Sequence, residues 1–165
     1  MTAALSGLHR PALDAHGRLA DGFGAGRVGV AGAGHVLGGA AEGFDRVETA
    51  MKLSPHDPVR PIWEHWICHL HSHLGQWEQA IEHCRLAAQG APYLWYTYAD
   101  LVAANAWLGR DAEAKAALAD LLKAKPDMTA QAYTATAASY SDDPVFTQQI
   151  ARMVEGMRKA GLPEE

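Results

Sequence analysis

Residues 74–126 read LGQWEQAIEHCRLAAQGAPYLWYTYADLVAANAWLGRDAEAKAALADLLKAKP, and this stretch decides the fold because it contains one pattern twice. Three pairs of positions recur at a spacing of 34 residues: Leu74-Gly75 and Leu108-Gly109, Ala80 and Ala114, and Pro92 and Pro126. A third copy lies upstream, where Gly38 is followed at the same offsets by a small residue, Gly43, and by Pro55. A fixed period of this length is the sequence signature of a repeat architecture. The sequence therefore predicts a row of similar structural units.

Each unit is predicted to be a helical hairpin. The glycine supplies the turn, the small residue lets the two helices approach closely, and the proline ends the second helix. The second helices carry apolar stripes at helical spacing, made by Trp77, Ala80, Ile81, Cys84, Ala87 and Ala88 in one unit and by Ala114, Leu118, Leu121 and Leu122 in the next. The first helices are expected at about Pro58 to His73 and Tyr93 to Trp107, with Asp57 as an N-cap.

The N-terminal region has a different composition, since eleven of the sixteen glycines lie in the first 43 residues. An interior glycine destabilises a helix or strand by about 0.5–1 kcal/mol relative to alanine. Residues 1–36 are therefore predicted to be a disordered or degenerate segment, and residues 37–165 an α-helical domain. Residues 24–29 have the glycine spacing of a dinucleotide loop, but neither a βαβ unit nor the acidic residue that such a loop needs follows, so we expect a flexible segment there.

The C-terminal region departs from the repeat. Residues 128–140 form an Ala- and Thr-rich helix candidate without a turn glycine in register, which suits a terminal unit covering the last hairpin. Asp143 is expected to cap a last helix with Pro144 at its first position, and Gly161 is expected to end it. The apolar stripe of this helix is predicted to comprise Val145, Phe146, Ile150, Met153, Val154 and Met157.

A 34-residue period with a turn glycine, a small residue and a terminal proline resembles the tetratricopeptide repeat family. The match covers residues 59–126, and residues 37–58 in part. Residues 53–58 and 155–163 also look like the repeat region C-terminal to bacterial class III adenylate or guanylate cyclase domains and that of related transcriptional regulators, although nothing here corresponds to the catalytic domain. The resemblance implies an all-α helical hairpin array, an α-solenoid with a C-terminal capping helix. It also implies a concave groove formed by the first helices and lined by His65, His69, Ser72, His73, Ala99, Ala103, Ala106 and Trp107.

Composition excludes some partners. The chain has 19 acidic residues against 14 Lys and Arg, a formal net charge of -5, which disfavours the broad basic surface that nucleic acid requires. No stretch approaches the ~18–20 apolar residues of a membrane span, and no signal peptide is evident. With only two cysteines, which is consistent with a reducing compartment, we expect a cytoplasmic protein with neither nucleic-acid nor membrane partners.

Histidine is concentrated, with six of nine between residues 56 and 83. His65, His69 and His73 are four residues apart and share one helix ridge, a geometry that can hold Zn, Ni or Cu. No cysteine or carboxylate has an obvious place as a further ligand, so we interpret the ridge as a polar groove wall and expect no metal or other cofactor. Cys68 and Cys84 are predicted to lie close together inside a hairpin, where a disulfide is conceivable but two small core thiols are the commoner arrangement.

These patterns favour a protein–protein interaction or scaffold module that binds a peptide or partner protein, rather than an enzyme. No nucleophile with a base, and no pair of carboxylates, stands at a spacing that catalysis requires. The resemblance implies a regulatory role in cyclic-nucleotide signalling or transcription. The alternatives are a cyclase-linked enzyme fragment, a His-based metal-binding protein, and a truncated remnant without an independent role.

Overall fold

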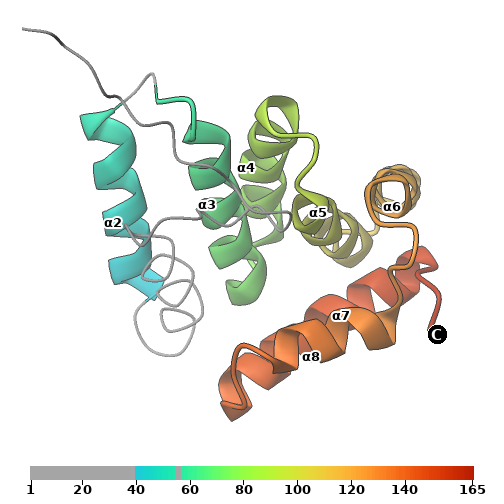
Figure 1. Ribbon diagram of the computed structural model, residues 1–165. Coiled ribbons are helices and arrows are strands. Elements are labelled where there is room, and N and C mark those ends of the chain that lie inside the picture. The colour runs from blue at the N-terminus through green and yellow to red at the C-terminus, as the bar shows by residue number, and fades with distance from the viewer. Residues whose placement is uncertain (1–39, 55–56) are drawn as a thin grey trace, which may run out of the picture.

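The computed structural model describes residues 40–54 and 57–165, and within these ranges every regular element is a helix (Figure 1). The helices are α2 (Ala40–Leu53), α3 (Arg60–Leu74), α4 (Trp77–Gly90), α5 (Trp95–Trp107), α6 (Asp111–Ala124), α7 (Ala130–Ala138) and α8 (Pro144–Ala160). The predicted all-α class is confirmed for this part of the chain. The expectations for residues 1–36, including the glycine pattern at 24–29, lie outside the described residues. None of the described helices is both long and apolar enough to cross a membrane.

Two helical hairpins, α3/α4 and α5/α6, form where the repeat predicts them. Gly75 and Gly109 adopt φ values of 73° and 67°, in the left-handed region that favours glycine. The N–H of Gly75 donates to the Ser72 carbonyl, and that of Gly109 donates to the Ala106 carbonyl, so both turns satisfy carbonyls left free at the ends of α3 and α5. The predicted turn positions are confirmed.

The first helices begin two residues later than predicted. α3 starts at Arg60 rather than Pro58, because the Asp57 carboxylate accepts the N–H of Val59 at 2.9 Å and caps a turn ahead of the helix instead of the helix itself. α5 starts at Trp95 because residues 91–94 form a turn closed by the Leu94 N–H and the Ala91 carbonyl. The second helices end at Gly90 and Ala124, two residues before the prolines, as predicted.

α8 is where the structure departs from a regular array. Asp143 caps it by accepting the N–H groups of Val145 and Phe146, and Gly161 ends it at φ 102°, both as predicted. In a regular array each hairpin contacts only its neighbours. Here α7 and α8 run across the other helices, and α8 packs on α5 and α6 and also reaches α3 (Figure 1). The capping helix therefore lies over the first helices of both hairpins, and the regular solenoid is not confirmed.

The α8 stripe is buried as predicted with one exception. Phe146, Ile150, Met153, Val154 and Met157 join the hydrophobic core, whereas Val145 at the first turn is half exposed. On the other side of this interface α5 is buried nearly all round, which explains its run of small and apolar residues. The core of the protein is thus the contact between α5 and the helices that surround it.

Ala114 tests the hairpin packing. It is 1% exposed within the hydrophobic core, so Ala114→Leu is expected to overpack α5/α6 and lower the free energy of unfolding by about 1–3 kcal/mol. Ala116 lies two residues further along α6 and is exposed, so Ala116→Leu is a matched control expected to change stability by less than about 0.5 kcal/mol. Urea unfolding measures both values. Equal effects of the two substitutions would contradict the packing described here.

Candidate functional site

The residues predicted to line an open groove lie together on α3 and α5, but the structure covers most of them. Five are at most 4% exposed: His65, Ser72, His73, Ala99 and Ala103. Of the others, His69, Ala106 and Trp107 keep partial exposure. The expectation of an open concave surface is therefore corrected. A helix of the same chain, α8, contacts His73, Ala103 and Trp107 on the face formed by α3 and α5, hereafter the α3–α5 groove. His65 is buried against α5 instead.

His73 is one anchor of α8 in the groove. The Phe146 ring stacks on its imidazole, with centroids 5.6 Å apart and planes 17° apart. Its Nδ1 lies 3.0 Å from Oε1 of Gln149. The Arg152 guanidinium donates to the backbone carbonyl of the same histidine, which is one of the carbonyls near the end of α3. Phe146, Gln149 and Arg152, which are spaced three residues apart along α8, thus all contact His73 of α3.

Trp107 is the second anchor. Its indole N–H donates to the Arg152 carbonyl at 2.9 Å, and the Lys159 ammonium lies 3.5 Å from a ring centroid, a cation–π contact. Gly156 is where the two backbones approach: a Cβ built there would lie 2.9 Å from the indole and 3.0 Å from Cα of Ala103. Glycine on α8 and alanine on α5 therefore let the helices pack in direct contact.

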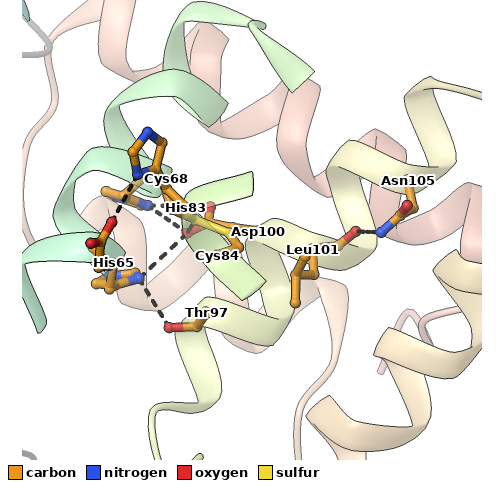
Figure 2. Close-up of a disulfide and its surroundings, with 10 residues drawn as sticks. His65, Cys68, His83, Cys84, Thr97, Asp100, Leu101 and Asn105 are labelled. Carbon is orange, nitrogen blue, oxygen red and sulfur yellow. Dashed lines mark hydrogen bonds and ion pairs between the residues drawn. A yellow bond between two sulfur atoms is a disulfide. The ribbon is translucent and has the colours of Figure 1, made fainter. Parts of the chain in front are cut away.

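A buried polar cluster, which we call the Asp100 cluster, lies deeper between α3, α4 and α5. Asp100 is fully buried, and Nδ1 of His69 lies 3.1 Å from its Oδ2. Nδ1 of His65 is 3.9 Å from the same oxygen and 3.1 Å from Oγ1 of Thr97 (Figure 2). Sγ of Cys68 is 3.6 Å from Asp100 Oδ2. A buried carboxylate is tolerated only with such partners.

Burial keeps two of the three ridge histidines neutral. Desolvation, reinforced by the neighbouring His69, lowers the pKa of His73 to about 3. The same two causes, in the same order, lower the pKa of His65 well below its usual value. At neutral pH both imidazoles are uncharged. The ridge imidazole in direct hydrogen-bond contact with the Asp100 carboxylate is His69, which is a quarter exposed.

Cys68 and Cys84 form a disulfide between α3 and α4 (Figure 2). The predicted proximity is confirmed, whereas the interpretation as two core thiols is not what the structure shows. The Cα atoms are 5.1 Å apart because the 16-residue separation places the two cysteines opposite each other in the hairpin. Closing a loop of about this length stabilises the folded state by about 3 kcal/mol.

Sequence reasoning missed Asp100, Gln149 and Arg152. The sequence shows no carboxylate beside the histidine ridge, because Asp100 belongs to the next repeat and is 31 residues from His69. A signal was present, since a single carboxylate within a mostly apolar helix needs a specific partner. The α8 residues gave no comparable signal, since their role depends on where α8 docks.

A separate depression of about 540 Å³ lies between α2 and the α3/α4 hairpin. Its lining comprises three apolar residues and five polar or charged ones: Phe44, Met51, Ile67, Glu48, Lys52, Arg60, His71 and His83. In the part of the chain that the structure describes, no group of three metal-ligating side chains includes His71 or His83. This depression therefore combines an apolar patch with charged side chains, and its histidines belong to no such ligand group among the described residues.

Comparison with protein-family models, with curated proteins and with solved structures finds no match to this chain. The resemblance to tetratricopeptide repeats and to cyclase-linked repeat regions thus stays a prediction from the sequence.

Substitution of Gly156 tests whether α8 packs against α5. Gly156→Ala is expected to lower the free energy of unfolding by about 1–3 kcal/mol, because the new methyl group meets Trp107 and Ala103. Helix propensity alone would give the opposite sign, a gain of up to about 1 kcal/mol. Chemical unfolding of the variant beside Glu155→Ala, an exposed neighbour on α8, measures the difference. A stabilised Gly156→Ala variant would mean that α8 does not rest on α5.

Proposed function

We propose that this chain is a protein–protein interaction module whose α3–α5 groove binds a helix of a partner protein. The observation that carries the proposal is the packing of α8 in that groove. This amphipathic helix is held there by its own apolar face and by the polar contacts at His73 and Trp107. An apolar helix face laid into a groove is a recurring mode of peptide recognition. Such a surface binds and orients a partner, and the proposal includes no catalytic step.

The anchors define the partner that would fit. Measured from an aromatic residue at the position of Phe146, the partner helix has a hydrogen-bonding amide three residues on, a guanidinium six residues on and a glycine ten residues on, as in α8. The amide meets His73, and the glycine admits the close approach of Ala103 and Trp107. These positions lie along one face of a helix.

In this proposal α8 acts as the resident competitor. A tethered helix has an effective concentration of about millimolar, so a free partner of equal intrinsic affinity must exceed that concentration to displace it. The resemblance to cyclase-linked repeat regions adds the context, a regulatory partner in cyclic-nucleotide signalling or transcription. Loss of α8 from the groove would then be the event that exposes the binding surface.

A labelled peptide of residues 142–165 tests whether the groove accepts a helix in trans. Gly156→Leu in the chain is expected to unseat its own α8, because the larger side chain meets Trp107, and to raise peptide affinity at least about tenfold over the unmodified chain. Fluorescence anisotropy measures the binding. The matched control is the same peptide carrying leucine at position 156, which is expected not to bind.

Circular dichroism establishes that the Gly156→Leu chain keeps its helices. If the variant loses them, the double variant Phe146→Ala, Arg152→Ala removes two anchors without adding bulk and serves instead. A folded variant that fails to bind the unmodified peptide would contradict the proposal.

A further inference from the structure

The Asp100 cluster brings two sets of metal-ligating groups to one carboxylate. The ligand atoms of Cys68, Cys84 and Asp100 lie within 4.8 Å of one another, and those of His65, His69 and Asp100 do the same. The two sets come from α3, α4 and α5, so no single-helix pattern in the sequence could have shown them. Asp100 is the member they share.

We propose that reduction of the Cys68–Cys84 disulfide converts this cluster into a binding site for a thiophilic divalent ion such as Zn²⁺, with Cys68, Cys84, Asp100 and His69 as its ligands. The site would tie α3, α4 and α5 together in the reduced protein, as the disulfide ties α3 to α4 in the oxidised one.

Two of the donor distances are close to those of a tetrahedral site, and His69, which is grouped with Asp100 but not with the two cysteines, has to turn toward the sulfurs. With Zn–S of ~2.3 Å and Zn–N and Zn–O of ~2.1 Å, tetrahedral edges are ~3.6 Å for S···O and ~3.4 Å for N···O. The structure has Cys68 Sγ 3.6 Å and His69 Nδ1 3.1 Å from Asp100 Oδ2. The two sulfurs must separate to ~3.8 Å, which reduction permits because the Cα atoms are already 5.1 Å apart.

The hydrogen bonds around His69 also suit a ligand at its Nδ1. Its Nε2 lies 3.0 Å from Nε2 of His73, whose Nδ1 donates to Oε1 of Gln149. With Nδ1 of His73 as donor, its Nε2 is placed to accept from Nε2–H of His69. A metal at Nδ1 of His69 takes the position that faces Asp100 and leaves this chain of hydrogen bonds intact. Hydrogen bonds of this kind orient metal-bound histidines and raise their affinity.

Reduction of the disulfide comes first and metal binding second. A dithiol reductant transfers two electrons and two protons to the disulfide and itself becomes a disulfide, so that two thiols replace the S–S bond. Metal binding then displaces both thiol protons to solvent, and Nδ1 of His69 binds the ion through its lone pair. Two thiolates and the Asp100 carboxylate face the divalent charge. Thiolate ligands select Zn²⁺ over Mg²⁺ or Ca²⁺.

Cobalt titration of the full chain tests the proposal. The protein is reduced with dithiothreitol, desalted under argon, and titrated with Co²⁺, whose tetrahedral thiolate complexes show visible d–d bands and a near-ultraviolet charge-transfer band. We expect both bands to saturate at one equivalent and to be abolished by Zn²⁺. The oxidised chain is expected to show neither band.

Variants separate the four-ligand site from other arrangements. Cys84→Ser, Asp100→Asn and His69→Gln are each expected to weaken Co²⁺ binding at least about 100-fold, and Gln149→Ala about 10-fold. His83→Gln is the matched control, an imidazole next to α3 outside the cluster, and is expected to bind as the unmodified chain does. Circular dichroism selects the variants that keep their helices.

Three results would overturn the proposal. A reduced chain without the charge-transfer band would show that the thiolates do not bind the ion. Equal binding by the oxidised chain would assign the ion to His65, His69 and Asp100 alone. A disulfide that dithiothreitol leaves intact in the folded chain, shown by thiol titration, would remove the redox step.

Discussion

The burial of α5 is the constraint on which the rest of the structure depends. This helix contacts α3, α4, α6 and α8, and eight of its 13 residues are buried. A helix enclosed on every side has to be apolar, or has to pair each polar group that it carries. Asp100 is paired with His69. Thr97 is paired with His65, and Asn105 donates to the Leu101 carbonyl (Figure 2), while Oδ1 of Asn105 is the exception and has no hydrogen-bond partner among the described residues. The polar chemistry of the protein is therefore gathered where α5 meets α3.

The same constraint explains why α8 occupies the α3–α5 groove. With α4 and α6 on its other sides, α5 would leave Ala103 open to solvent if α8 were absent, and this residue is fully buried next to Gly156 of α8. The apolar stripe of α8 needs an equivalent surface. The apolar stripe of α8 and the open side of α5 thus bury each other. Any partner helix must replace both this apolar contact and the anchors at His73 and Trp107 before it gains affinity.

Sequence alone predicted the elements better than their assembly. Turn glycines, terminal prolines and the Asp143 cap act within a few residues, so Gly75, Gly109 and the bounds of α8 could be located without knowing the fold. The place of α8 depends on long-range packing, and an amphipathic stripe does not specify which surface covers it. For the same reason the histidine ridge was recognised, whereas its carboxylate, 31 residues away, was not. The cysteines were placed correctly because a hairpin is a local structure, but their bonding was not.

The groove and the Asp100 cluster are not independent, because they share His73. Its Nδ1 contacts Gln149 of α8 and its Nε2 contacts His69, the neighbour of Asp100. If α8 leaves the groove, His73 loses the acceptor that fixes which of its nitrogens carries the hydrogen, and the orientation of His69 loosens with it. If the docking of α8 changes the equilibrium between two states of the Asp100 cluster by some factor, that change of state must in turn change the affinity of the groove for α8 by the same factor, because linkage is reciprocal. His73, whose ring centroid lies 4.4 Å from that of His69, therefore connects α8 to the Asp100 cluster through two hydrogen bonds.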